Sequence, residues 1–122
     1  MLSISEVSRQ TGLPIHTLRY YDECGLLPRV QRDDNGYRRF DDDDLEWIGI
    51  LKCLKATEMP LAEMQAFTEL VQEDIHTASD RLALLRTHRQ QFEARLAEIH
   101  VALEVIDGKI AYYSDLDNTS TS

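Results

Sequence analysis

The sequence predicts a mainly α-helical protein in which two short helices and a small β-hairpin precede a long C-terminal helix. Three observations predict this fold: a Gly-Leu-Pro break between two short helical segments, an Asn35-Gly36 turn between two short polar strands, and apolar residues spaced three and four apart from Leu82 to Tyr113. The 122 residues are 43% hydrophobic and include only five Gly and three Pro. This composition excludes a disordered or collagen-like chain and allows one modest core.

Two short helices are expected at the N-terminus. Ser3 and Glu6 have the three-residue spacing of a capping box, which predicts a first helix over residues 4–11. The Gly-Leu-Pro sequence that follows breaks this helix and opens a second one over residues 15–23, which ends before Gly25. Two helices joined by a tight turn that contains glycine form a helix-turn-helix, whose second helix enters the major groove when such a motif binds DNA.

A two-stranded wing is expected next, because residues 29–32 and 37–40 flank the turn sequence Asp-Asp-Asn-Gly. The acidic run at residues 41–44 then marks the start of a third helix, since carboxylates cap free N–H groups and favour the positive end of a helix dipole. From Leu45 to Leu54 this helix is apolar around most of its circumference. We therefore expect neighbouring elements to cover it on most sides.

The C-terminal half is expected to be helical and to need a partner. A fourth helix with one buried stripe is predicted over residues 61–71, and a heptad seam interrupted only by Arg89 predicts a coiled-coil helix over residues 81–113. At ~1.5 Å per residue this last helix is roughly 48 Å long, more than so small a protein can cover, so the seam implies a second copy of the chain. The predicted domains are a winged helix-turn-helix at 1–71, a linker at 72–80, the coiled-coil dimerisation helix at 81–113 and a flexible tail at 114–122.

The net charge of −9 is unevenly distributed along the chain. Residues 1–40 contain six Arg and five acids, residues 41–66 contain two Lys and seven acids, and residues 67–122 contain five basic and ten acidic side chains. The first third is therefore the only part where a polyanion can dock without strong repulsion.

The second predicted helix contains the sequence Thr-Leu-Arg-Tyr-Tyr at residues 17–21. Together with Ile-Ser-Glu-Val at 4–7, Gly-Leu-Leu-Pro at 25–28 and Gly-Tyr-Arg-Arg-Phe at 36–40, this sequence resembles the MerR family of bacterial transcription regulators, with a match from residue 3 to about residue 70. The resemblance implies a homodimer, held by an antiparallel coiled coil, that binds double-stranded promoter DNA at a pseudo-palindrome. It also implies that the dimer distorts an overlong promoter spacer so that RNA polymerase can engage both promoter elements.

Four candidate DNA-binding residues lie on the second helix. The Arg19 guanidinium suits a bidentate contact with phosphate or a base edge, and Tyr20 offers a hydroxyl; a solvated Arg and a half-buried Tyr are the alternative. His16 and Thr17 lie near the helix start, where they either reach bases or serve as cap and surface residues. Tyr21 is expected to pack in the core.

Three further candidates come from the resemblance alone. It implies that Tyr37 and Arg38 grip the DNA backbone from the wing, whereas Arg39 alternates to the other strand face. It also implies a phosphate contact for Lys55, although a plain surface lysine fits this position nearly as well. The candidate DNA-binding residues are therefore His16, Thr17, Arg19, Tyr20, Tyr37, Arg38 and Lys55.

The two cysteines are expected to be free thiols, since they lack C-x-x-C spacing, which argues against a structural disulfide or a zinc knuckle, and a reducing cytosol keeps such thiols free. Residues 50–61, 81–85 and 109–113 resemble the aldehyde- and electrophile-responsive branch of the family, which has a Cys where this chain has Cys53. The resemblance implies that Cys53 senses an electrophilic effector; the alternative is a small apolar core residue. Two neighbouring lysines favour its thiolate and burial opposes it. Cys24 is expected to be structural.

An enzyme, a metal site and a bound cofactor are not expected. No Cys follows position 53, and no cluster of His, acid and nucleophile is recognisable. The opening residues lack the regions of a signal peptide and no stretch reaches the ~18 apolar residues of a membrane span, so a cytoplasmic protein is expected. The alternative to a DNA-binding regulator is a dimeric adaptor, derived from a helix-turn-helix, that binds protein.

Overall fold

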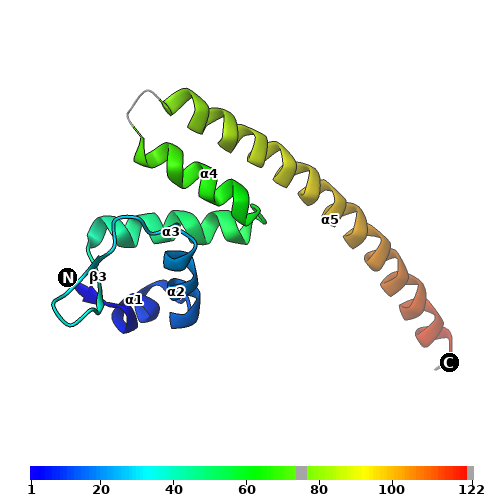
Figure 1. Ribbon diagram of the computed structural model, residues 1–122. Helices are drawn as coiled ribbons and strands as arrows, with labels where there is room; N and C mark the ends of the chain where they lie inside the picture. The colour runs from blue at the N-terminus through cyan, green and yellow to red at the C-terminus, as the bar shows by residue number, and fades with distance from the viewer. Residues whose placement is uncertain (74–76, 121–122) are drawn as a thin grey trace. The chain divides into compact units, whose positions relative to one another are not determined.

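The computed structural model describes residues 1–73 and 77–120, with the side chains of residues 1–73 and 77–119. The chain divides into two compact units, Met1–Leu84 and the segment that begins at Leu85. No helix in the described ranges is long and apolar enough to cross a membrane. The elements, labelled in Figure 1 where there is room, are β1 (Leu2–Ser3), α1 (Ile4–Thr11), α2 (Ile15–Glu23), β2 (Gln31–Arg32), β3 (Arg38–Phe40), α3 (Asp42–Ala56), α4 (Leu61–Gln72) and α5 (Ala78–Ser120).

The predicted helix-turn-helix is confirmed. A capping box starts α1, because the Ser3 hydroxyl accepts the N–H of Glu6 at 3.2 Å while the Glu6 carboxylate accepts the N–H of Ser3 at 3.3 Å. Gly12 ends α1 in the left-handed conformation, with a φ of 77° that a residue with a Cβ adopts only at a cost. Pro14 precedes α2, whose bounds match the prediction.

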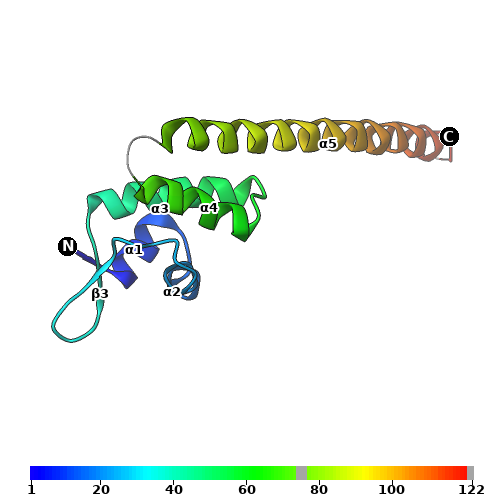
Figure 2. The same cartoon turned by 45° about the horizontal axis from the view of Figure 1, so that its top comes forward.

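The wing is confirmed, with shorter strands than predicted and with one strand that the sequence analysis missed. The sheet order is β1-β3-β2 with both pairs antiparallel, so the N-terminal β1 adds a third strand in which Leu2 is opposite Phe40. In the turn, the Asp33 carboxylate accepts the N–H groups of Asn35 at 2.9 Å and Tyr37 at 3.0 Å. Figure 2 shows the loop between β2 and β3 extending away from the helices.

The acidic run starts α3 as predicted, through a second capping box between Asp41 and Asp44 with hydrogen bonds of 2.8 and 3.0 Å. The expectation that α3 is covered on most sides is wrong, because both Ile50 and Cys53 are exposed. The buried core residues of α3 follow one another at intervals of three along one face of the helix. Ile50 and Cys53 are also three residues apart, but they lie on a different face. The core residues of α3 are Ile48, Leu51 and Leu54, of which the first two are fully buried.

The core of the first unit lies where α1, α2, α3 and α4 meet β3. Figures 1 and 2 show α4 running beside α3, and the Trp47 ring of α3 stacks on the Phe67 ring of α4 with centroids 5.8 Å apart. Each fully buried aliphatic side chain there contributes about 1.5–3 kcal/mol. The buried apolar residues are Val7, Leu18, Tyr21, Leu26, Leu27, Phe40, Ile48, Leu51, Leu54, Met59, Met64 and Phe67.

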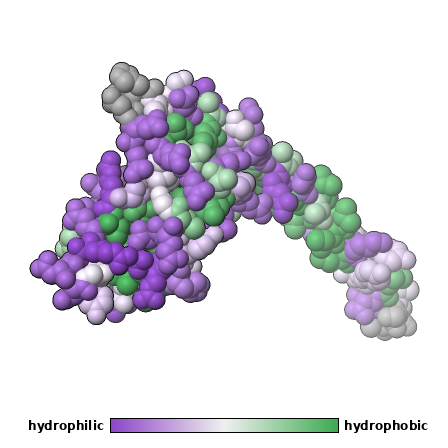
Figure 3. All heavy atoms as spheres, viewed as in Figure 1, coloured by the Kyte–Doolittle hydropathy of each residue, from purple (hydrophilic) through white to green (hydrophobic). Residues whose placement is uncertain are grey.

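The last helix is longer than predicted. The expected flexible tail at 114–122 is helical as far as Ser120, because no Gly or Pro follows Gly108 to end α5; residues 121–122 lie outside the described residues. The predicted linker at 72–80 includes residues 74–76, which also lie outside them. Most seam residues of α5 beyond Leu85 are exposed, and Figure 3 shows apolar side chains gathered on this helix.

Candidate nucleic-acid interface

Helix α2 has one buried face and one exposed face. Leu18 and Tyr21, three residues apart, are buried in the core, which confirms Tyr21 as a packing residue. His16, Arg19 and Tyr20 therefore lie on the opposite side and are exposed. This arrangement presents a guanidinium, an imidazole and a phenol to solvent from a single helix, and such groups suit phosphate and base-edge contacts.

The Tyr20 hydroxyl lies beside the Cys24 thiol at the end of the same helix. A side-chain hydrogen bond with Cys24 raises the pKa of Tyr20 above its ordinary value of 10.0. Tyr20 remains 49% exposed, whereas Cys24 is partly buried and packs against the core. Cys24 is therefore part of the packing at the end of α2, as expected.

The wing presents its two candidate residues differently. Tyr37 is 67% exposed at the end of the turn. Arg38 is largely covered, and its Nε donates to the Asp22 carboxylate of α2 at 2.6 Å. Arg39 forms a similar pair with Asp33 at 3.0 Å within the wing. Arg38 therefore joins β3 to α2 in addition to any contact with DNA.

Asp22 is not among the predicted site residues, because the pair that it forms with Arg38 joins residues 16 positions apart in two different elements. Neither helical nor strand periodicity brings such residues together. The opposite charges of the two side chains were visible in the sequence, but many other pairs were equally compatible. Only the packing of the wing against α2 selects this one.

The remaining candidates lie at helix ends. His16 and Thr17 are in the first turn of α2, where Thr17 is half-buried. Pro14 occupies the N-cap position without a side-chain hydrogen bond, so neither residue is the cap that the alternative reading proposed. Lys55 is exposed in the last turn of α3, just before a turn in which Glu58 has a positive φ of 66°.

Cys53 lies on the surface of α3, so the alternative that it is a core residue is wrong. Of its two neighbouring lysines, Lys52 donates to the carbonyl oxygen of Thr11 at 2.6 Å and so caps the end of α1. Lys55 is exposed nearby on the same helix. Within residues 1–73 and 77–119, no group of three or more His, Cys, Asp and Glu side chains is placed to hold a metal ion.

Comparison with known proteins agrees with this geometry. The model for the MerR HTH family regulatory protein matches residues 2–70, and the model for the MerR DNA-binding region matches residues 45–109. An uncharacterized HTH-type transcriptional regulator of Haemophilus influenzae is 37% identical over 109 residues, which cover 89% of this chain and 81% of that protein.

Solved structures extend the similarity to the whole fold. The crystal structure of HiNmlR, a MerR family regulator lacking the sensor domain and bound to promoter DNA, matches with a TM-score of 0.85 and 35% identity over 93% of this chain and 90% of that chain. A MerR family structure from Listeria monocytogenes matches with a TM-score of 0.87 and 31% identity over 93% and 86% of the two chains. The chain therefore belongs to the MerR family, and it is a DNA-binding transcription regulator and not an enzyme.

Proposed function

We propose that this regulator acts as a homodimer that binds a pseudo-palindromic promoter site and distorts the DNA in response to a signal, so that RNA polymerase can engage the promoter. The observation that carries the proposal is the exposed face of α2, which presents Arg19 and Tyr20 while the opposite face is locked into the core. A helix that is held by its buried face and leaves polar side chains free on the other face is what major-groove docking requires.

The proposed DNA contacts fall into two groups. Arg19 and Tyr20, with His16 and Thr17 one turn earlier, read base edges and phosphates from α2. Tyr37 and Arg38 of the wing and Lys55 of α3 contact the backbone and set the register. The balance of six Arg and five acids in residues 1–40 supports the six contacts placed in α2 and the wing, because the acidic excess of the chain lies elsewhere.

The proposed dimer forms through α5. Seam residues such as Leu96 and Leu103 are 43% and 48% exposed in the single chain, and they recur at heptad spacing with the other seam residues. An apolar stripe of this length on one helix needs a partner, and an antiparallel second copy supplies one of matching length and pattern. Two copies then place two α2 helices on the DNA, as a pseudo-palindromic site requires.

Cys53 is the proposed sensor of an aldehyde or another electrophile. Its exposure supports this role, because a small reagent can reach the thiol without unfolding the core. With an aldehyde, the thiolate sulfur bonds to the carbonyl carbon, and the carbonyl oxygen then takes a proton from water to complete a hemithioacetal. The adduct forms on the helix that follows the wing, so it can bias the spacing of the two DNA-binding lobes.

A binding experiment with native promoter DNA tests the proposed function. DNA from immediately upstream of the gene for this protein and of its neighbours is titrated with the full chain in a gel shift, with a scrambled fragment of equal length as the control. We expect selective binding and a footprint with two related half-sites. Equal binding to both fragments would refute the proposed operator recognition, and binding to neither fragment would favour the protein-binding adaptor.

A further inference from the structure

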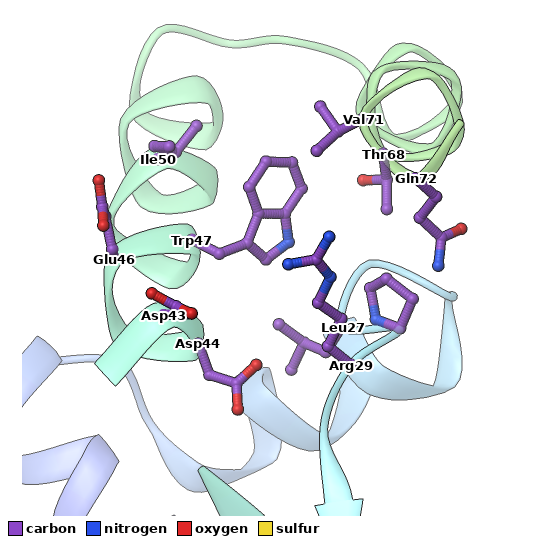
Figure 4. Close-up of a pocket in the computed structure, with 11 residues that line it drawn as sticks. Leu27, Arg29, Asp43, Asp44, Glu46, Trp47, Ile50, Thr68, Val71 and Gln72 are labelled. Atoms are coloured by element: carbon purple, nitrogen blue, oxygen red, sulfur yellow. The ribbon is translucent and has the colours of Figure 1, made fainter. Parts of the chain in front are cut away.

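A cavity of about 300 Å³ lies within the first compact unit, between the loop that leaves α2, the first half of α3 and the end of α4 (Figure 4). Its size reaches the lower end of the range for small-ligand pockets. Neither Cys53 nor any of the seven candidate DNA contacts lines it. The DNA and thiol proposals above therefore leave this cavity without a function.

Trp47 forms a fixed aromatic wall of the cavity. Figure 4 shows its indole projecting from α3 among the other lining residues, with Val71 of α4 beyond it. The indole Nε1 donates to the carbonyl oxygen of Leu26 at 2.7 Å, and the ring stacks on Phe67, which does not line the cavity. These two contacts hold the indole in place before any ligand arrives, so a ligand loses little affinity to ordering this wall.

The charged lining is predominantly acidic. Asp43, Asp44 and Glu46 contribute three carboxylates, against a single guanidinium from Arg29. Asp44 is committed to the capping box of α3. Asp43 and Glu46 are exposed, and within residues 1–73 and 77–119 neither forms an ion pair. The cavity thus combines a rigid apolar wall with two carboxylates that can pair with a ligand.

We propose that this cavity binds a small amphipathic cation, an amine that carries an aromatic or branched aliphatic body. The body packs against Trp47 and the aliphatic wall, while the ammonium group lies toward Asp43 and Glu46. A carboxylate of the same shape is disfavoured by the acidic excess, and a neutral alcohol binds through its apolar body alone.

A ligand bound in this cavity can affect the DNA-binding lobe, because the cavity adjoins the connection between α2 and the wing. The lining includes Leu27, Pro28 and Arg29, which connect α2 to the wing, together with residues of α3 and α4. A ligand that contacts all three walls restrains that connection. Ligand binding in this cavity requires neither the operator nor a reactive Cys53, so it can be tested independently of both.

Trp47 is the only tryptophan of the chain, so its fluorescence reports directly on the cavity. The full chain, without DNA, is titrated with 2-phenylethylamine, 2-phenylethanol and 3-phenylpropionate, which share a phenyl ring and differ in charge. We expect a saturable change in emission with the amine, a weaker response with the alcohol and the weakest with the carboxylate. No saturable change with the amine, or equal binding of the carboxylate, overturns the proposal.

Matched variants locate the effect. Asp43→Asn combined with Glu46→Gln should weaken amine binding by about three- to tenfold, as expected for two exposed charge pairs, and leave the alcohol unchanged. Asp42→Asn combined with Glu69→Gln removes two exposed acids outside the cavity, one from α3 and one from α4, and should leave amine binding unchanged. Val71→Phe fills the cavity and should abolish the response, whereas Cys53→Ser should preserve it. Equal loss in both acid pairs, or full binding by Val71→Phe, also overturns the proposal.

Discussion

The Nε of Arg38 lies 2.6 Å from a carboxylate oxygen of Asp22, and this ion pair fastens the last strand of the wing to the recognition helix α2. Both side chains are largely covered, at 15% and 22% exposure, so water screens the pair less than it would a surface pair. The pair holds the wing against α2, and we propose that it thereby sets the angle at which both meet DNA. Arg38 consequently has a positioning role that a simple phosphate contact would not require.

Two variants distinguish positioning from phosphate contact. Asp22→Asn keeps every positive charge but weakens the pair, so it should lower operator affinity without changing the salt dependence of binding. Arg38→Ala should lower the operator affinity and also reduce the salt dependence of binding. It should lower the free energy of unfolding by about 1–2 kcal/mol, because the Asp22 carboxylate loses its partner. Affinity is measured by fluorescence anisotropy at several salt concentrations, and stability by urea denaturation.

The exposed Glu23, next to Asp22, provides the control for stability, since Glu23→Gln leaves the ion pair intact and should leave the free energy of unfolding unchanged. If Asp22→Asn binds the operator as well as the native chain does, the ion pair has no positioning role.

Arg19→Ala should weaken operator binding about tenfold or more and reduce the slope of log affinity against log salt by about one, if its guanidinium reaches phosphate. Loss of affinity with an unchanged slope would instead indicate a base contact. Arg86→Ala removes an equal charge from α5 and should change neither the operator affinity nor the slope of its salt dependence. An Arg19→Ala protein with native affinity and native slope would remove Arg19 from the interface.

The capping boxes and turns were predictable because their signals are local. Ser3 with Glu6 and the Asn35-Gly36 turn each act within a few residues, and the structure confirms both. The strand β1 was missed because its partner β3 lies far along the chain and two residues carry no periodicity. The exposure of Cys53 could not be predicted from the sequence either, since an apolar run does not reveal which faces of a helix have neighbours.

The dimer prediction is tested on the seam of α5. Leu96→Asp or Leu103→Asp places an unpaired charge in the proposed helix interface and should convert a dimer at micromolar concentration into a monomer. Ala97→Asp introduces the same charge one position outside the seam and should leave the dimer intact. Light scattering gives the mass directly, to be compared with 14.1 kDa for one chain. A monomeric native chain would contradict the proposed assembly.

The wing should lose stability in acid because of Asp33. The N–H of Tyr37, followed by Arg39 and the N–H of Asn35, lowers the pKa of Asp33 below 3.8. Because the pKa of Asp33 is lower in the folded chain, its ionised carboxylate stabilises the fold at pH values above 3.8. This stabilisation disappears as the pH falls through the pKa that Asp33 has in the folded chain. Asp33→Asn should therefore be less stable than the native chain near pH 7, with a difference that shrinks below pH 4.

The exposed Asp34 is the matched control for this experiment, since the stability of Asp34→Asn should depend on pH in the same way as that of the native chain. Thermal unfolding followed by circular dichroism measures all three proteins. A constant difference between Asp33→Asn and the native chain from pH 7 to pH 3 would show that the carboxylate charge does not stabilise the turn.

The two cysteines should differ in their reactivity toward an electrophilic signal. Cys53 is exposed on α3 and Cys24 is packed at the end of α2, so a small aldehyde should modify Cys53 first. Cys53→Ser should bind the operator with native affinity but lose aldehyde-dependent transcription from it, whereas Cys24→Ser should retain both. An α,β-unsaturated aldehyde serves as the probe, because the thiol sulfur bonds to its β-carbon and the resulting thioether survives digestion. Peptide mass spectrometry then shows which cysteine carries the adduct. Full induction in the Cys53→Ser protein would exclude the thiol as the sensor, and the aromatic cavity at Trp47 would then be the site at which to look for the effector.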